Sequence, residues 1–406
     1  MNAQMLCVLN TGSSSIKLSL FKSKRNQGIE LVYTASLEGI FTPSPCWKSS
    51  YASPSNLDLK AFYCHEQALD CFFDYLLKEN SQIIHAPYMV HRIVHGGSSF
   101  TSCTLLDEKN QASLEEISEL APLHNPLALK ALEIARKKIS KAKHYGVFES
   151  AFFAKFPPHV ALYPIPYELS MRYQIKRYGF HGISHSYMWK EYLKYHPSSS
   201  SAKIITLHLG SGCSLAAIDA GQCKETTMGF TPLDGLMMAT RSGEVDPGII
   251  AFVAKQEHKS MDEMMEMLNS SSGLLGVSGR SGDMKELIHL YEVDSRAKLA
   301  VDMFIHHVLK AIGSFIAVLG SVDALVFSAG MAENAPFIRE RLLFQLADFG
   351  IYLDSQMNRK IFALKPAQWE SLHQEKSKVG LFVVGANENE AMALEAFQVI
   401  KAEGIK

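Results

Sequence analysis

The stretch Asn10-Thr11-Gly12-Ser13-Ser14-Ser15-Ile16-Lys17 decides the fold of this chain, because it joins two apolar runs at residues 5–9 and 18–21. This pattern predicts a strand, a tight turn and a second strand. Gly12 permits a turn geometry that a β-carbon would resist. The serine hydroxyls, the backbone N–H groups and Lys17 can then face an anion, although an ordinary serine-rich hairpin explains the pattern equally well. A Walker A loop is excluded, because no G-x-x-x-x-G-K-[ST] pattern occurs.

A second copy of this pattern lies about half the chain away. An apolar run at residues 203–209 leads into Gly210-Ser211-Gly212-Cys213-Ser214, and residues 215–218 are apolar again. Gly12 aligns with Gly210, and strand–helix alternation follows each copy. The two hairpins predict an α/β protein of two duplicated domains, with an interdomain cleft that both hairpins line.

Charge and composition restrict the partners. The chain has 406 residues, a formal net charge of −1, and 47% hydrophobic and 20% charged residues, as a soluble globular protein does. Nucleic acid and anionic membranes bind basic surfaces, so neither is expected as a partner. Seven cysteines without a C-x-x-C pair, and the lack of a signal-like start, favour the cytoplasm. The apolar helix around residues 299–320 carries Asp302 and Lys310, so we expect a buried core helix.

Local patterns predict further elements. Helical periodicity predicts helices at residues 65–79 and 126–141. Ser113 and Ser184 are expected to cap helices, and residues 41–56, rich in proline and serine, are expected to form a loop. Strands are predicted at residues 88–94, 144–148, 324–327 and 380–384.

Two arginines occupy positions that suit anion binding. Arg92 lies at the end of a predicted strand, before Gly96 and Gly97, and Arg241 lies in a turn close to Glu244 and Asp246. A guanidinium can bind a phosphate or a carboxylate through two parallel hydrogen bonds. An ion pair with a neighbouring acid is the alternative for each arginine. If the two halves of the chain face each other, both arginines could reach one transferring phosphoryl group.

Other residue types point to the same chemistry. His181, which follows an aromatic residue and precedes a glycine, could donate to a developing negative charge or serve a structural role. The turn at residues 330–334 follows a strand and opens a helix, which suits a nucleotide contact, although such turns are also common where nothing binds. The glycine-rich loop around Asp283 is open between a hinge, a nucleotide contact and a connector. Oxygen-bearing side chains that suit Mg²⁺ end predicted strands at Asn10, Glu149 and Glu388.

Together these segments resemble the acetokinase family, which includes acetate, propionate and butyrate kinases. The family signature N-x-G-S-S-S-[LI]-K is present at residues 10–17, and a second signature, H-x-G-x-G-x-S with M-G-F-T-P-[LD]-x-G-[LI], matches residues 208–236. The resemblance spans nearly the whole chain, with further matches at residues 91–97, 121–126, 177–185 and 240–247.

The resemblance implies a fold of two RNase-H-like domains of the actin/Hsp70/sugar-kinase type. The N-terminal domain would comprise residues 1–150 and about 386–406, and the C-terminal domain, with most nucleotide contacts, residues 151–385. It also implies ATP/ADP, Mg²⁺ (or Mn²⁺) and a cytoplasmic homodimer. The implied activity is reversible phosphoryl transfer from ATP to a short-chain carboxylate, acetate first, giving an acyl phosphate and ADP.

The resemblance also assigns roles residue by residue. The implied catalytic residues are Arg92, His124, Glu149, His181 and Arg241. Asn10 and Glu388 are similar to the metal-site residues, and the acyl pocket would contain Val94, Leu123, Phe180 and Pro232. The implied nucleotide and phosphate contacts are Ser13, Ser15, Lys17, His208, Gly210, Gly212, Asp283, Met284, Lys285, Gly330 and Asn334.

Several positions depart from the family pattern. Glu149 stands where the family usually has aspartate, and Phe153 where it has histidine. The changes leave both arginines intact and concentrate on the nucleotide side. They put adenine preference and metal geometry in question at Ser211, Met284, Lys285 and Ala332.

The implied chemistry needs charge stabilisation and no proton acceptor. A carboxylic acid with a pKa of ~4–5 is already ionised at neutral pH. The difficulty is to bring two anions together and to stabilise a loose, highly charged transition state. We therefore expect Glu149 to organise metal and water. The alternatives are a propionate or butyrate preference, a nucleotide-driven switch that binds a protein, and a relative that keeps nucleotide without turnover.

Overall fold

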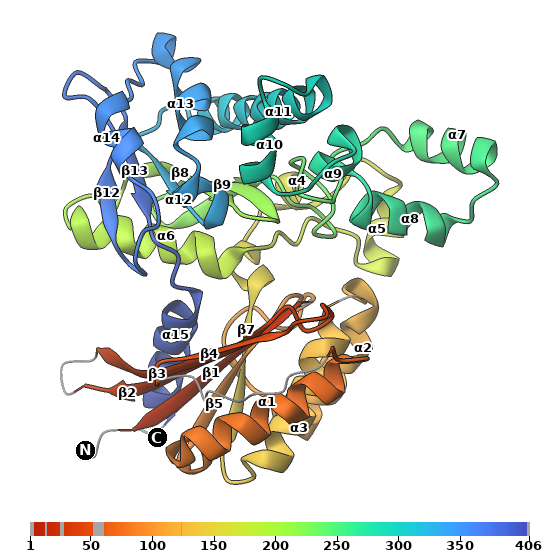
Figure 1. Cartoon of the computed structure of the whole chain (residues 1–406), viewed down its shortest axis with the longest axis vertical. Helices are drawn as coiled ribbons and strands as arrows, with labels where there is room; N and C mark the ends of the chain where they lie inside the picture. The colour runs from red at the N-terminus through yellow and green to blue at the C-terminus, as the bar shows by residue number, and fades with distance from the viewer. Residues whose placement is uncertain (1–3, 13, 25–27, 52–60, 123, 404–406) are drawn as a thin grey trace. The chain divides into compact units, whose positions relative to one another are not determined.

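The computed structural model describes residues 4–12, 14–24, 28–51, 61–122 and 124–403. The chain divides into two compact units (Figure 1). Unit 1 contains Met1–Ala151 and Glu388–Lys406, and unit 2 contains Phe152–Asn387. Each unit is a mixed sheet with helices, so the predicted α/β class is confirmed.

Unit 1 is built on a seven-stranded sheet in the order β4-β3-β2-β1-β5-β7-β6. Helices α1 and α3 cover one face and contribute Phe72, Phe73 and Ile134 to the core. Helix α15 packs against β1, β5 and β7. The elements are β1 Met5–Thr11, β2 Ser15–Ser23, β3 Ile29–Glu38, β4 Cys46–Ser49, α1 His65–Glu79, β5 Tyr88–Ile93, β6 Thr104–Leu105, α2 Glu108–Glu116, α3 Asn125–Lys138, β7 Lys143–Phe148 and α15 Glu388–Glu403.

Unit 2 is built on a six-stranded sheet in the order β10-β9-β8-β11-β13-β12. Helices α6 and α11 pack against this sheet. Its strands are β8 Lys203–Leu209, β9 Cys213–Asp219, β10 Gln222–Thr226, β11 Ala324–Ser328, β12 Trp369–Ser371 and β13 Gly380–Val384. Its helices are α4 Pro158–Ala161, α5 Tyr167–Tyr173, α6 Gly182–Tyr195, α7 Pro247–Glu257, α8 Met261–Ser270, α9 Gly273–Ser278, α10 Met284–Leu290, α11 Ser295–Leu319, α12 Gly330–Asn334, α13 Pro336–Phe344 and α14 Ser355–Lys360.

The two sheets repeat one topology. The order β3-β2-β1-β5-β7 in unit 1 corresponds to β10-β9-β8-β11-β13 in unit 2. In both sets the first three strands are antiparallel neighbours, and the last three are parallel neighbours. The predicted duplication is therefore confirmed, and the two turns that first suggested it join equivalent strand pairs, β1–β2 and β8–β9.

Three local predictions were wrong. Residues 41–56 contain a strand, β4, which pairs with β3 because Trp47 packs on Phe72 at 5.4 Å between ring centroids. Ser113 lies inside helix α2, and the helix is capped instead by Asp107, which accepts from the Asn110 N–H at 2.8 Å. Ser184 lies inside the first turn of α6, and its hydroxyl bonds a histidine ring instead of capping the helix.

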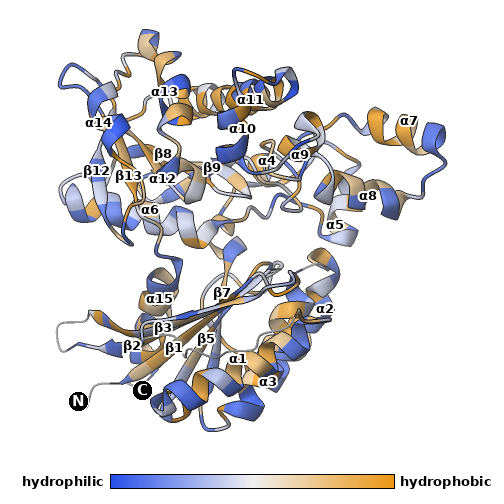
Figure 2. Ribbon diagram, in the orientation of Figure 1, coloured by the Kyte–Doolittle hydropathy of each residue, from blue (hydrophilic) through white to orange (hydrophobic). Residues whose placement is uncertain are grey.

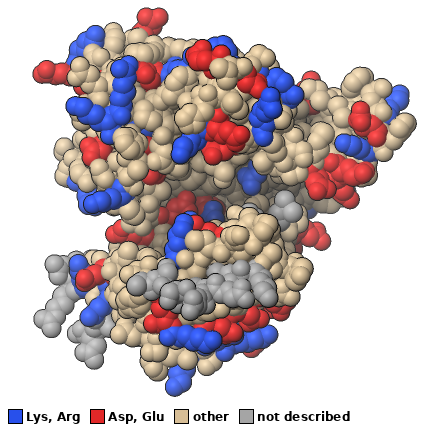
Figure 3. All heavy atoms as spheres, viewed as in Figure 1, with Lys and Arg blue, Asp and Glu red and all other residues tan. Residues whose placement is uncertain are grey.

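Helix α11 is a core helix, as predicted. In the described part of the chain it alone is long and apolar enough to cross a membrane. Its buried residues recur at helical spacing, including Val301, Phe304, Val308 and Ile312, and they face α9, α10 and the sheet. A stripe of this kind is what a core helix of a soluble protein presents to its neighbours. On the face shown in Figure 3, basic and acidic side chains are interspersed over both units.

Candidate active site

In unit 1, an ion pair between a half-buried arginine and a buried glutamate lies at the ends of two neighbouring strands. Arg92 is on β5, Glu149 directly follows β7, and these strands are parallel neighbours, so their carboxyl ends meet at one edge of the sheet. The Arg92 Nε donates to Glu149 Oε1 at 2.6 Å, and Nη1 donates to Asn10 Oδ1 at 3.3 Å. The Glu149 side chain is only 2% exposed. Three predicted site residues, far apart in sequence, are therefore in direct contact.

Nearby carboxylates stabilise the charged form of Arg92. Burial alone would lower the pKa of this guanidinium, but Glu149 and Glu388 outweigh burial and raise the pKa above its usual value. Glu388, at the first position of α15, is thus part of the same charge cluster. The cluster offers carboxylate and amide oxygens, the donors that Mg²⁺ prefers, with room in its usual coordination for water and phosphate. The donor set fits Mg²⁺.

Backbone contacts hold the segment after Arg92 in place. The side chain of Asn125 accepts from the His95 N–H at 3.1 Å and donates to the His95 carbonyl at 2.9 Å. Ser150 accepts from the Gly96 N–H at 3.0 Å. Val94 and His124, two of the predicted site residues, lie half-buried on either side of this connection, before His95 and before Asn125. The predicted contacts Ser13 and Leu123 lie outside the described residues.

Lys17 and Ser15 lie on β2 rather than in the turn. Lys17 is directly opposite Asn10 on β1, and it is exposed. Its side chain lines a polar cavity of about 270 Å³ together with Glu38 and Lys48, which pair at 2.5 Å. The predicted phosphate-facing lysine is thus one strand away from the arginine cluster.

In unit 2, His181 has a strained backbone held by close packing. It precedes α6 with φ of +57°, a left-handed conformation that costs a residue with a side chain of order 1–3 kcal/mol. Two residues earlier, Gly179 has φ of +71°, and a β-carbon there would lie 2.5 Å from the ring of Phe153. Backbone N–H groups of Tyr178 and Gly179 both reach the Gly229 carbonyl. This packing explains why a glycine and a strained histidine occur together.

The imidazole of His181 belongs to a cluster of rings and hydroxyls. Its ring stacks on His208 with centroids 4.1 Å apart, and its Nδ1 lies 2.9 Å from the Ser214 hydroxyl. Ser214 also lies 2.8 Å from Nε2 of His185. His208 in turn has its Nδ1 2.8 Å from Ser184 Oγ. The predicted catalytic and nucleotide-side histidines are therefore in contact.

Among the described residues, Arg241 has no carboxylate partner, unlike Arg92. Its Nη1 donates to the Pro232 carbonyl at 3.4 Å and approaches Met238 Sδ at 3.9 Å. Asp246, the nearby acid, instead caps α7 by accepting from the Gly248 N–H at 2.7 Å. Within the described ranges no ion pair includes Arg241, and burial lowers its pKa. A buried guanidinium without a carboxylate is stabilised by an anionic ligand.

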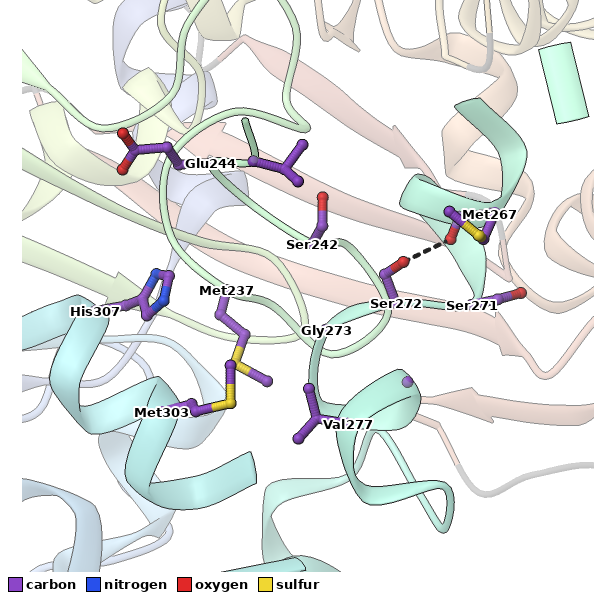
Figure 4. Close-up of a pocket in the computed structure, with 12 residues that line it drawn as sticks. Met237, Ser242, Glu244, Met267, Ser271, Ser272, Gly273, Val277, Met303 and His307 are labelled. Carbon is purple, nitrogen blue, oxygen red and sulfur yellow. Dashed lines mark hydrogen bonds between the residues drawn. The ribbon is translucent and has the colours of Figure 1, made fainter. Parts of the chain in front are cut away.

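Backbone hydrogen bonds stabilise the turn that carries Arg241. Ser242 N–H donates to Leu268 and Ser272 N–H to Thr240, each at 2.9 Å. Behind the turn lies a cavity of about 410 Å³ lined by Met237, Met267 and Met303. Figure 4 shows the Ser272 hydroxyl bonded to the Met267 carbonyl, with Glu244 and His307 on the far side. The residues predicted for the site do not line this cavity.

The predicted nucleotide contacts are spread over several elements of unit 2. Gly210 and Gly212 form the β8–β9 turn, and a β-carbon at Gly212 would lie 3.2 Å from His181 Nε2 and 3.7 Å from Arg241 Nη1. Gly330 is exposed at the start of α12, and a β-carbon there would meet no atom within 4 Å. Phe180 is buried and Pro232 is half-buried. Of the rest, Met284 is buried, whereas Asp283, Lys285 and Asn334 are exposed.

Some residues of the site are missed by sequence reasoning. Arg339 is fully buried, and its Nη1 donates to the Ala332 carbonyl at 2.6 Å. Glu333 accepts from Ala329 and Ala386 N–H groups at 2.8 and 2.9 Å. Glu333 thereby holds Ala329, directly before α12, and Arg339 holds α12 itself. The available signal was a charged residue beside apolar residues in a helical segment, because a buried charge needs a partner.

Comparisons with known proteins agree on one family. A family model described as the acetokinase family matches residues 5–394. An acetate kinase of Treponema denticola is 37% identical over 98% of this chain and 100% of its own length, and one of Clostridium beijerinckii is 35% identical over 97% and 99%. Among solved structures, Porphyromonas gingivalis acetate kinase (32% identity, TM-score 0.86) covers 98% of this chain and 100% of its own. A Francisella tularensis propionate kinase (33% identity, TM-score 0.86) covers 97% and 98%.

Proposed function

The chain belongs to the acetokinase family, and from this premise we propose that it transfers the γ-phosphoryl group of ATP reversibly to acetate. The coarser statement, an enzyme that uses ATP to phosphorylate a short-chain carboxylate, follows from the family. The choice of acetate and the mechanism are our proposal. The observation that carries the mechanism is the half-buried Arg241, which lies near His181 and has no carboxylate partner in the described part of unit 2.

The reaction requires no base. A carboxylate oxygen of the acid attacks the γ-phosphorus while the bond from that phosphorus to the bridging oxygen breaks, so ADP leaves and an acyl phosphate forms. No proton has to move, because the acid is already ionised. Charge on the transferring group must be stabilised by fixed donors. We assign this work to Arg241 and His181, and the binding of the acid to Arg92, with His124 nearby.

Mg²⁺ would neutralise the phosphates. Asn10 and Glu388 supply the oxygens that we assign to it, with Glu149 orienting a bound water or the ion through its outer sphere. Glu149 also keeps Arg92 charged, which supports an organising role for this carboxylate. The metal's identity, Mg²⁺ or Mn²⁺, is open to a direct assay of each ion.

The nucleotide and acyl assignments complete the proposal. We assign the phosphates and the nucleoside to Ser13, Ser15, Lys17, His208, Gly210, Gly212, Asp283, Met284, Lys285, Gly330 and Asn334. The acyl methyl group is assigned to a small apolar pocket of Val94, Leu123, Phe180 and Pro232. Val94 and Pro232 favour a small alkyl group, acetate first and propionate next. Propionate is the second candidate, favoured by the structural similarity to a protein described as a propionate kinase.

A substrate panel tests the proposal. Acids of two to four carbons are crossed with ATP, other nucleoside triphosphates and pyrophosphate, and acyl phosphate is trapped as the hydroxamate. The expected result is the highest kcat/KM with acetate and ATP, and a lower value with propionate. A higher value with propionate or butyrate would overturn the acetate assignment. Lack of acyl phosphate with every pair would overturn the enzymatic one and favour a nucleotide-binding relative.

We also propose a cytoplasmic homodimer. Apolar side chains are exposed on α5 and α7, including Tyr167, Tyr173, Ile249 and Phe252. Figure 2 shows α7 as largely hydrophobic. Each of these helices exposes several apolar groups, which suits a protein interface. Light scattering of the purified chain would give twice the monomer mass, and a monomer at micromolar concentration would contradict the proposal.

A further inference from the structure

A chain of buried polar side chains extends from His181 into the core of unit 2. His181 Nδ1 lies 2.9 Å from Ser214 Oγ, and Ser214 Oγ lies 2.8 Å from His185 Nε2. His185 Nδ1 then lies 2.7 Å from Thr206 Oγ1. His185 and Thr206 are 0% exposed, as is Ser214. Buried polar groups of this kind persist when each has a partner, and here every step is a short hydrogen bond.

This chain of hydrogen bonds has two self-consistent directions. In one, His181 Nδ1–H donates to Ser214, Ser214 donates to His185, and His185 Nδ1–H donates to Thr206, whose hydroxyl turns to the Ala216 carbonyl at 3.4 Å. In the other, Thr206 donates to His185, His185 Nε2–H donates to Ser214, and Ser214 donates to His181 Nδ1. Because a neutral imidazole has one N–H, the two directions correspond to opposite tautomers of His181.

The surroundings keep His185 neutral. It is fully buried, and burial, together with the nearby His208, lowers its pKa well below the usual value. The ring of Phe153 lies against it at 6.1 Å between centroids. Phe153 stands where the related family usually has a histidine, so this chain has an apolar ring at that contact. A neutral His185 can therefore pass the direction of the hydrogen bonds from Thr206 to Ser214 without introducing a charge.

The groups around His181 favour its neutral form. Three charged or titratable groups lie near His181 among the described contacts. The Arg241 Nη1 and the His181 Nε2 both lie close to Gly212. The ring of His208 stacks on His181, and His185 lies on the other side of the Ser214 hydroxyl. Cys213, in the same turn, is buried and keeps its proton, because burial raises the pKa of its thiol to about 12. A second positive charge on His181 beside Arg241 is disfavoured by like-charge repulsion. A neutral His181 can donate from Nε2 only if its Nδ1 carries no proton, and a hydrogen bond accepted by Nδ1 favours that tautomer.

We propose that Thr206, His185 and Ser214 are positioning residues that select the Nε2–H tautomer of neutral His181. The Ser214 hydroxyl donates to Nδ1, so Nε2 carries the proton and can donate to the charge that develops on the transferring phosphoryl group. The proposal rests on the function proposed above for its purpose, but the tautomer exists independently of turnover. Donors oriented in advance cost no reorganisation when the charge appears.

The tautomer is measured directly by ¹⁵N NMR of histidine-labelled protein, with His181→Gln to identify the resonance. At pH 8 the expected spectrum has a protonated Nε2 and a bare, hydrogen-bonded Nδ1 at His181. A protonated Nδ1 with a bare Nε2 would overturn the proposal, and so would a doubly protonated ring. This readout needs no catalysis, so it separates failure of the inference from failure of the proposed function.

Kinetics give a second test. With the tautomer selected, kcat should stay level between pH 6 and pH 9. In Ser214→Ala the neutral ring is divided between both tautomers, and Nε2–H is fully present only in the doubly protonated ring. The kcat should therefore fall by about twofold or more as the pH rises over this range. Thr206→Val, isosteric and further from the site, should change the profile in the same direction by less. Ser214→Thr restores the hydroxyl and should restore the level profile.

A matched control distinguishes this role from simple packing. Ser184→Ala removes the hydroxyl that bonds the other stacked ring, His208, and should leave the shape of the pH profile unchanged. Equal loss at every pH in Ser214→Ala, Thr206→Val and Ser184→Ala would identify a structural role and overturn the proposal.

Discussion

Arg92 in unit 1 and Arg241 in unit 2 are the same side chain in opposite environments. Arg92 donates to a buried carboxylate at 2.6 Å, and the acids around it raise its pKa. Arg241 contacts a carbonyl and a thioether, and burial lowers its pKa. An arginine that is already paired is held in one geometry, whereas an arginine without a carboxylate gains most from an anionic ligand. The comparison indicates that the Arg92 guanidinium is fixed by its carboxylate partner, whereas the Arg241 guanidinium can bind an anionic ligand.

The largest effect is expected from Arg241→Ala. If this guanidinium stabilises the transferring phosphoryl group, turnover should fall by about 10³-fold or more, as when other phosphoryl-transfer enzymes lose such an arginine. Acyl-phosphate formation measures the loss, and the unfolding midpoint checks the fold. Arg359→Ala is the control, because that exposed arginine pairs with Glu340 on the surface, and its kcat should change less than about twofold. Near-normal turnover in Arg241→Ala would remove the contrast between the two arginines.

A smaller loss is expected from Glu149→Gln. The amide keeps a hydrogen-bond acceptor for Arg92 but removes the negative charge, so activity and apparent Mg²⁺ affinity should fall by about 10- to 100-fold. Titration of kcat with Mg²⁺ measures the shift. Glu149→Asp keeps the charge and should retain most of the activity. Normal Mg²⁺ dependence with an altered pH–rate profile would instead identify Glu149 as a proton acceptor.

Acid should destabilise the chain through the buried His91–His144 pair of unit 1. Their ring nitrogens lie 2.9 Å apart, and burial lowers the pKa of His144 to about 4 and that of His91 well below its usual value. The unfolded chain binds protons as the pH falls through about 6.5, while folded His144 does not bind one until about 4, so stability falls over that window.

The expected loss is on the order of 2–3 kcal/mol from His144 alone. Urea unfolding at pH 7, 6 and 5 measures it, and His144→Gln, which cannot titrate, should flatten the dependence. A midpoint that does not change with pH in the parent chain would show that this pair is not the acid-sensitive element of unit 1.

The smallest effect is expected on the nucleotide side. Ser211 is exposed in the β8–β9 turn, and its carbonyl accepts from the Ala239 N–H at 3.0 Å. Ser211→Asn, the residue usual in the family, adds an amide donor at this turn and should lower the KM for ATP by about 2- to 10-fold, the value of one neutral hydrogen bond. The KM for acetate should not change. A change confined to acetate would place this turn on the acyl side instead.

Most of the architecture could be predicted from the sequence. Apolar runs around Gly12 and Gly210, with the strands and helices after each, predicted the duplicated α/β fold, because periodicity is a local property. The missed elements are those that depend on distant partners. β4 forms because Trp47 packs on Phe72 of α1, and α2 starts at Glu108 because Asp107 caps it. The local composition of a segment, here rich in proline and serine, contains no information about such distant partners.

For the candidate site, too, the sequence predicts the local features and the tertiary structure decides the contacts. By itself the sequence determined which charged residues stand at strand ends and in turns, including Arg92, Arg241 and Glu149. Only the tertiary structure decided that Arg92 has a carboxylate partner and Arg241 has none among the described residues, and that Ser184 bonds His208. It also brought together Thr206 on β8, Ser214 on β9 and His185 on α6. The physical reason is that strand register and helix packing set such distances, and both arise from contacts between segments far apart in the chain.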